Sequence, residues 1–150
     1  MKIKKNSKLI NIWHKVLKHH ILFFWDPVFL YMAIIFYLSS IPEPPIPGFI
    51  IKIFSTKTGL VLHFFEYFIL SFLTSIALRH SKHSFFNKHH YLLAILIASL
   101  YGISDEIHQI FVPGRFATIS DALINIVGAG FAQFIRWLLK KEKTIIDKII

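Results

Sequence analysis

The chain has 150 residues, of which 55% are hydrophobic and 17% are charged, with 17 Lys and Arg against eight Asp and Glu. Soluble domains carry about 25% charged residues, and disordered chains are poor in aromatic and aliphatic residues. Together with a mean hydropathy of +0.57, this composition favours a single-domain membrane protein over a disordered chain or a soluble nucleic-acid binder. Because the sequence has no cysteine, disulfides, thiolate metal sites and cysteine nucleophiles are excluded.

Residues 1–26 predict a basic amphipathic helix. Apolar residues such as Trp13 and Leu17 share one helical face, with lysines elsewhere, so we expect this segment to lie on an anionic membrane surface. Asp26 followed by Pro27 is typical of a helix start, which predicts a break or kink near Asp26. The segment lacks a small-residue cleavage site, and we therefore expect it to be retained rather than removed as a signal peptide.

Four apolar stretches follow, each a candidate for a membrane-spanning helix. They cover residues 27–41, 60–78, 91–112 and 119–139. Pro113 and Gly114 predict the end of the third stretch, and Thr118 or Ser120 the cap of the fourth. We therefore predict an all-α, polytopic membrane protein, with a four-helix bundle over residues 27–139 and a basic tail over 140–150.

The basic residues predict the orientation of this bundle. Fourteen of the 17 Lys and Arg lie in residues 1–20, 79–90 and 136–150. Since positive charge stays on the cytoplasmic side, we expect both termini and the 79–90 loop in the cytoplasm, in a bacterial inner membrane. The loop histidines are expected to be solvated rather than metal-bound: His80, His83, His89 and His90.

Polar and ionisable residues cluster within the spans, where they are costly and point to function. At 1.5 Å per residue they lie roughly 9–10 Å inside the outer ends of three spans, while the opposite halves read as apolar. The candidates for catalysis or metal binding are His63, Glu66, Asp105 and Glu106, and those for ligand binding are Ser40, Tyr67, Gln109, Arg115, Asp121 and Asn125.

For some of these residues, a purely structural role is an alternative to a functional one. Ser40, Tyr67, Gln109 and Asn125 could join helices through hydrogen bonds, and Asp121 could cap a helix. The chain has more acidic groups in its spans than these structural roles require. Like charges in a low dielectric need protons, cationic partners or a bound divalent cation. We expect His108 at the rim of the site.

Three motifs resemble the VanZ-like family: HFFEY at 63–67, SDEIHQIFVPGR at 104–115 and SDALINIVG at 120–128. The family comprises small membrane proteins and is named for one linked to low-level resistance to the glycopeptide teicoplanin. Many members carry an Asp-Lys pair shortly before the histidine, where this chain has apolar residues at 60–62. The resemblance marks Ser40, His63, Glu66, Tyr67, Asp105, Glu106, Gln109, Pro113, Gly114, Arg115, Asp121, Asn125 and Gly128.

Three functions are compatible with these residues. The first is binding of an envelope lipid or a glycopeptide-like ligand, with Arg115 holding a phosphate or carboxylate. The second is an intramembrane enzyme, with His63 and Glu66 as base and orienter and Asp105 with Glu106 on a divalent cation. The third is proton-coupled transport. Small residues could also allow homo-oligomers: Ala98, Gly102, Gly128, Ala129 and Gly130.

Overall fold

The computed structural model describes residues 23–42 and 48–149, with side chains described for 23–42 and 59–141. Every regular element in that part of the chain is helical, which confirms the all-α prediction there. The elements are the N-proximal helix Phe23–Ser39, α2 (Gly48–Arg79), α3 (Ser84–Lys88), α4 (His90–Gln109) and α5 (Ile119–Ile149). The amphipathic helix predicted for residues 1–26 lies mostly outside the described residues.

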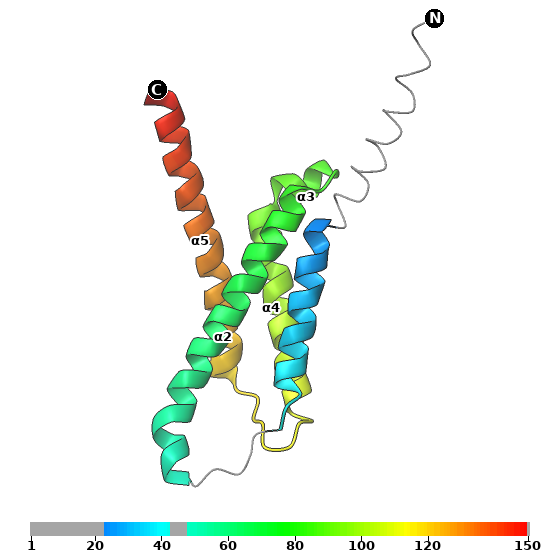
Figure 1. Ribbon diagram of the computed structural model, residues 1–150, viewed down its shortest axis with the longest axis vertical. Coiled ribbons are helices and arrows are strands. Elements are labelled where there is room, and N and C mark those ends of the chain that lie inside the picture. Colours follow the sequence, from blue (N-terminus) through cyan, green and yellow to red (C-terminus); the bar gives the residue numbers. More distant parts are fainter. Residues whose placement is uncertain (1–22, 43–47, 150) are drawn as a thin grey trace, which may run out of the picture.

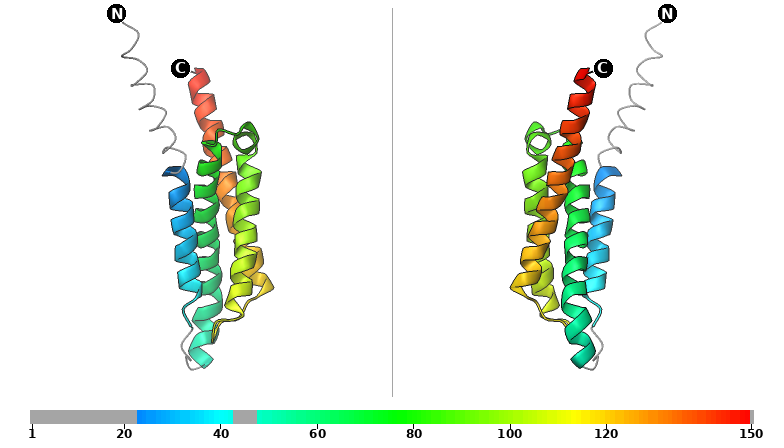
Figure 2. Two further views of the ribbon diagram at one scale, coloured as in Figure 1. Left: turned by 90° about the vertical axis from the view of Figure 1, so that its right-hand side faces the viewer. Right: turned by 90° about the vertical axis from the view of Figure 1, so that its left-hand side faces the viewer.

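The helices run alternately up and down the long axis of the molecule (Figures 1 and 2). α2 contacts both α4 and α5, and α4 contacts α5. The N-proximal helix is tied to α4, since the Tyr101 hydroxyl donates 2.6 Å to the Met32 carbonyl. The end that carries α3 is called the basic end below, and the end that carries the α4–α5 loop is called the polar end.

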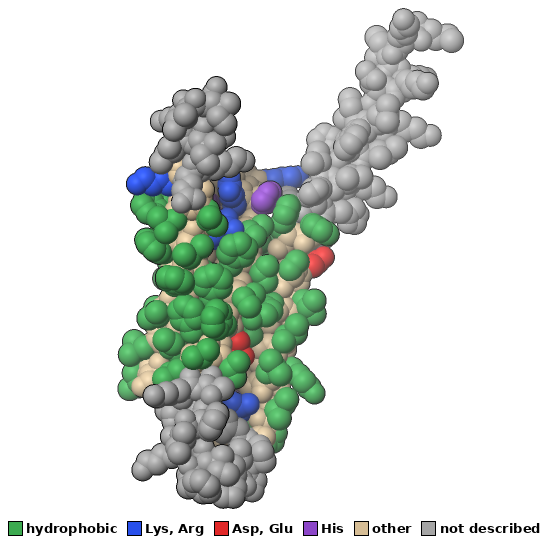
Figure 3. Space-filling model, turned by 60° about the vertical axis from the view of Figure 1, so that its left-hand side comes forward, with side chains coloured by type: hydrophobic (Ala, Val, Ile, Leu, Met, Phe, Trp, Pro, Cys, Tyr) green, Lys and Arg blue, Asp and Glu red, His purple; other side chains and the backbone are tan. Residues whose placement is uncertain are grey.

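Three helical segments are long and apolar enough to cross a membrane: Gly59–Arg79, His90–Gln109 and Ile119–Lys141. The N-proximal helix is apolar but shorter. Figure 3 shows one face of the molecule covered by hydrophobic side chains, with Lys and Arg gathered toward one end. An apolar belt between polar ends suits a bilayer.

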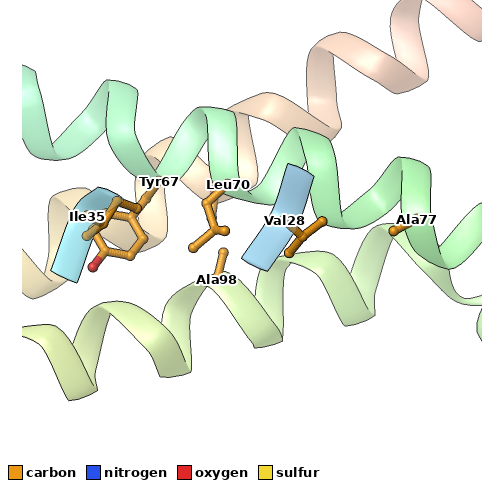
Figure 4. Close-up of a cluster of buried hydrophobic side chains, with 7 residues drawn as sticks. Val28, Ile35, Tyr67, Leu70, Ala77 and Ala98 are labelled. Atoms are coloured by element: carbon orange, nitrogen blue, oxygen red, sulfur yellow. The ribbon is translucent and has the colours of Figure 1, made fainter. Parts of the chain in front are cut away.

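Small residues on α4 bring its neighbours close. Ala94, Ala98 and Gly102 recur at every fourth position of α4 and are all buried. Figure 4 shows Ala98 beside Leu70, with Val28 and Ile35 of the N-proximal helix in the same apolar cluster. Small side chains at such interfaces let helices pack closely in membranes.

Gly128 sets the approach of α5 to α2. A Cβ atom added to Gly128 would lie 2.3 Å from the carbonyl oxygen of Phe64. No side chain fits at that distance, so the two backbones can touch here only because this residue is glycine. The contact fixes α5 beside the HFFEY segment of α2.

The helices differ from the predicted stretches at some of their ends. The span predicted over residues 60–78 agrees with the apolar segment Gly59–Arg79, and α2 extends before it to Gly48, because Gly59 weakens a helix but does not end one. The N-proximal helix runs through Asp26 and Pro27 without the predicted break. Proline removes one backbone hydrogen bond, and the burial of Val28 in the core holds the helix together across it.

The last two helices also differ in where they end. α4 ends at Gln109, before the predicted limit of Val112, and the turn that follows places Gly114 at φ 80°. Only glycine adopts that conformation readily. α5 begins at Ile119 as predicted, and its apolar segment ends at Lys141, close to the predicted residue 139. The helix itself continues to Ile149 through the predicted basic tail.

Candidate functional site

Asp105 is held by two structural partners near the end of α4. Its side chain is buried, and its two oxygens accept hydrogen bonds of 2.6 Å from the Ser39 hydroxyl and 2.9 Å from the Gln109 amide. The carboxylate therefore joins the N-proximal helix to α4. Gln109 orients that carboxylate from one turn further along the same helix.

Of two adjacent serines at the end of the N-proximal helix, Ser40 was a predicted site residue and Ser39 was not. Ser40 Oγ donates to the Phe36 carbonyl at 2.6 Å and lies 2.9 Å from His108 Nε2. The His108 ring also stacks on Phe36, with centroids 4.5 Å apart. Ser39 could have been found from spacing, because it follows Ile35 at the helical interval that faces the core.

Three helices bring a histidine and carboxylates together. His63 Nδ1 on α2 lies 3.9 Å from Glu106 Oε1 on α4 and 3.9 Å from Glu66 Oε2. Asn125 on α5 donates to the same Glu106 oxygen at 3.4 Å. One ligand atom each from His63, Glu106 and Asp121 lies within 4.8 Å of the others. Among the described residues, no other group of three or more such ligands comes this close.

Several polar atoms in this region are buried without a hydrogen-bond partner among the described residues. They are His63 Nδ1, Tyr67 OH, Glu106 Oε2 and Asn125 Oδ1. Buried polar groups are almost always satisfied in folded proteins, and leaving one unpaired costs about 1–3 kcal/mol. The arrangement can therefore hold a molecule or ion that supplies the missing partners.

Tyr67 and Asn125 occupy space that Gly102 leaves open. Both side chains are fully buried. A Cβ atom on Gly102 would lie 3.0 Å from Tyr67 Cε1 and 3.1 Å from Asn125 Nδ2. The glycine of α4 thus lets polar side chains of α2 and α5 enter the centre of the bundle, one helical turn from Glu106.

Asp121 is also bonded to the N-cap of α5. The Thr118 hydroxyl donates to Asp121 Oδ2 at 2.7 Å, and the Asp121 backbone N–H donates to Thr118 Oγ1 at 3.1 Å. The second bond satisfies one N-terminal donor of the helix, so Thr118 rather than Ser120 is the N-cap, and the first bond holds the Asp121 carboxylate beside it. One oxygen of Asp121 accepts from the Thr118 hydroxyl, and the residue still belongs to the group formed by His63 and Glu106.

Arg115 turns back over the end of the N-proximal helix. Its Nε donates to the Ile41 carbonyl at 3.2 Å and its Nη2 to the Leu38 carbonyl at 3.1 Å. Terminal carbonyls of a helix lack intrahelical donors. The guanidinium supplies them here, so Arg115 anchors the α4–α5 loop to the N-proximal helix.

His90 is not a solvated loop residue, so that part of the prediction was wrong. It begins α4, is buried, and its Nδ1 lies 3.0 Å from Ser75 Oγ on α2. Because α4 begins at His90 itself, the ring lies against α2 rather than in the loop. His80 and His83 are exposed, as predicted.

The interior of the basic half of the bundle contains polar side chains, although these halves of the spans were predicted to be apolar. Gln133 Nε2 donates to the carbonyl and hydroxyl oxygens of Ser71 at 2.9 and 2.8 Å, and Ser71 Oγ donates to the Ala129 carbonyl at 3.0 Å. These bonds join α2 to α5. Gln133 lies two helical turns beyond Asn125, and this spacing could have placed it on the same inward face.

A family model described as VanZ/LLP1 matches residues 13–140, and the chain therefore belongs to the VanZ/LLP1 family. The match includes all three motifs that carried the resemblance. A search of curated proteins finds no significant match, and neither does a search of solved structures.

Proposed function

We propose that this VanZ/LLP1 protein crosses a bacterial inner membrane four times and binds an amphiphilic ligand of the cell envelope between its helices. The N-proximal helix acts as the first span, packed on α2 and α4 through Val28 and Ile35. The ligand would enter at the polar end. Binding there would alter susceptibility to glycopeptides such as teicoplanin.

The basic end supports an orientation with both termini in the cytoplasm. Positive charge is retained on the cytoplasmic side of membrane proteins. The basic side chains described at this end are Arg79, Lys82, Lys88, Lys140 and Lys141. This orientation directs the polar end toward the outer leaflet, where lipid-linked sugars, cell-wall precursors and glycopeptides are met.

The unpartnered polar atoms carry the binding proposal. Glu106 Oε2 and Asn125 Oδ1 are acceptors without donors among the described residues, and the Tyr67 hydroxyl lacks a partner. Sugar hydroxyls and amides supply both donors and acceptors, so such a headgroup would satisfy all three. Membrane hydrocarbon could satisfy none of them.

The test is to identify what the purified protein retains, by native mass spectrometry of protein extracted with its lipids. We expect a polar-headgroup envelope lipid enriched over bulk phospholipid. Asn125→Leu should lose it, whereas Ser99→Ala, which removes a buried unpartnered hydroxyl elsewhere, should keep it. Wild-type protein that carries only bulk phospholipids would reject the proposal.

A second function is favoured by the group formed by His63, Glu106 and Asp121. One imidazole nitrogen and two carboxylate oxygens form a donor set that suits Zn²⁺ and related cations. A cation there would polarise a phosphoryl or acyl oxygen of the ligand, which would make the protein a metal-dependent hydrolase. Glu66, 3.9 Å from His63, would orient the imidazole.

Element analysis of dialysed protein separates this function from binding alone. We expect the dialysed protein to retain about one divalent cation per chain, because a site with several protein ligands binds its metal tightly. Asp121→Asn should lower that content, because it removes a charged ligand and keeps an oxygen that can accept the capping bond. Asp26→Asn, on an exposed side chain, is the control. Equal metal content in the two variants would remove the hydrolase from consideration.

A further inference from the structure

Arg136 lies inside the α5 span, away from the polar cluster, and one of its donors is unused. Its guanidinium carbon lies 4.9 Å from the centroid of the Phe72 ring on α2. Its Nε is buried with no hydrogen-bond partner among the described residues. Arginine within a span is costly unless it is paired, so an anion is the expected partner.

The charged neighbours that act on this region are cationic. His90 at the start of α4 is within electrostatic range of Arg136, Arg79 and Lys140. These four side chains form a basic group, and they come from α2, α4 and α5. The described acidic side chains lie elsewhere: Asp26 is exposed on the N-proximal helix, and Glu66, Asp105, Glu106 and Asp121 lie toward the polar end.

An aromatic strip runs along α2 and α5 up to this basic group. On α2, Phe68 and Phe72 stack with centroids 6.4 Å apart, and Phe68 lies 6.2 Å from Phe131 on α5. Phe131, Phe134 and Trp137 continue the strip at intervals of 6.3 Å. Phe131, Phe134 and Trp137 are all about half exposed, so the strip presents apolar surface to its surroundings.

We propose that this is a binding site for an anionic phospholipid of the leaflet at the basic end. The lipid phosphate is held by Arg136, with His90 and Arg79 beside it, and an acyl chain lies along the aromatic strip. Basic pockets between helices on the cytoplasmic side of membrane proteins recognise such headgroups. The strip selects a lipid over free phosphate, because only a lipid brings an apolar chain attached to the anion. The site is separate from the polar cluster and does not depend on the function proposed for it.

Lipid titration followed by native mass spectrometry tests the headgroup contact. We expect the wild-type protein in detergent to bind phosphatidylglycerol in preference to phosphatidylcholine. Arg136→Gln should reduce that preference about fivefold, the effect of one basic side chain on anionic lipid. Lys88→Gln, which removes an equal charge from the exposed α3, should leave it unchanged. Equal preference in the wild type and Arg136→Gln would overturn the proposal.

Fluorescence of Trp137 tests the strip in protein that retains Arg136. In a Trp13→Phe, Trp25→Phe background, brominated phosphatidylglycerol should quench Trp137 several-fold more than brominated phosphatidylcholine at equal concentration. Inorganic phosphate should not displace the brominated lipid. Equal quenching by the two lipids, or displacement by phosphate alone, would contradict a phospholipid site.

Discussion

Two adjacent serines at the end of the N-proximal helix have different partners. Ser39 donates to the buried carboxylate of Asp105 at 2.6 Å, whereas Ser40 donates to a carbonyl of its own helix and lies 2.9 Å from the part-buried His108 ring. Hydrogen bonds to charged groups are stronger than neutral ones. The inter-helix attachment should therefore depend more on the first serine than on the second.

Ser39→Ala is expected to lower the free energy of unfolding by about 1–3 kcal/mol, the cost of leaving a buried acceptor one bond short. Ser40→Ala should lower it by less, about 0.5 kcal/mol, because its contact with the His108 ring is only part-buried. Thermal unfolding of both variants in the same detergent measures the difference. Equal melting temperatures for the two variants would show that the bond to Asp105 carries no stability.

The polar residues of the site were predictable from the sequence, but their individual hydrogen-bond partners were not. His63, Glu106 and Asp121 stood out because ionisable groups are rare in apolar stretches. Their neighbours depend on how each helix is rotated about its axis, which tertiary packing sets. That is why Ser39 was missed and why the donors of Arg115 were not expected to meet the carbonyls of Leu38 and Ile41.

At the scale of elements, two glycines of α5 form a matched pair. A Cβ atom on Gly128 would lie 2.3 Å from the Phe64 carbonyl oxygen, whereas one on Gly130 would meet nothing within 4 Å. Both residues lie in the same helix, so the gain in helix propensity on substitution by alanine is the same for both.

Gly128→Ala should therefore force α2 and α5 apart and reduce folded protein severely, since overpacking against backbone costs typically 1–3 kcal/mol or more. Gly130→Ala should be neutral or stabilising by up to about 1 kcal/mol. Size-exclusion profiles and melting temperatures of the two variants provide the comparison. A stable, monodisperse Gly128→Ala protein would show that the close approach of α2 and α5 is not required.

Helix existence was predictable from sequence, but helix ends were not. Apolar stretches of 15–22 residues identified four helices. Gly59 and Pro27 read as boundaries, yet both lie inside helices, because one weak residue is outweighed by the packing of the residues around it. The end of α4 was nearer to expectation, because Pro113 and Gly114 together cannot continue a helix.

At the scale of the whole molecule, the proposed orientation can be checked with single cysteines, since the natural chain has none. We expect Phe116→Cys, in the α4–α5 loop, to react with an impermeant thiol reagent applied to intact cells. Ser84→Cys, at the start of α3, should react only after the membrane is permeabilised. Both positions are exposed, so burial does not explain a difference between them.

The opposite labelling pattern would invert the molecule and direct the polar end to the cytoplasm. Labelling of both positions in intact cells would rule out the up-and-down crossing itself. The cysteine-free parent chain controls for background reaction.

The alternating course of the helices was predictable from charge, because basic segments recur after every second span. The polar interior of the basic half was not predictable, since serine and glutamine are common in spans and do not by themselves indicate a contact between helices. Gln133 and Ser71 acquire their role only when α2 and α5 lie side by side. A single sequence does not contain that pairing.

The bond between Ser39 and Asp105 joins residues 66 positions apart, and this separation has a consequence during synthesis. At roughly 5–20 residues per second, the N-proximal helix is complete about 3–13 s before its partner on α4 leaves the ribosome. Ser39 Oγ also has a local acceptor, the Phe36 carbonyl at 3.1 Å. The hydroxyl can therefore be satisfied within its own helix before α4 is made, and it bonds to the carboxylate once α4 packs against that helix.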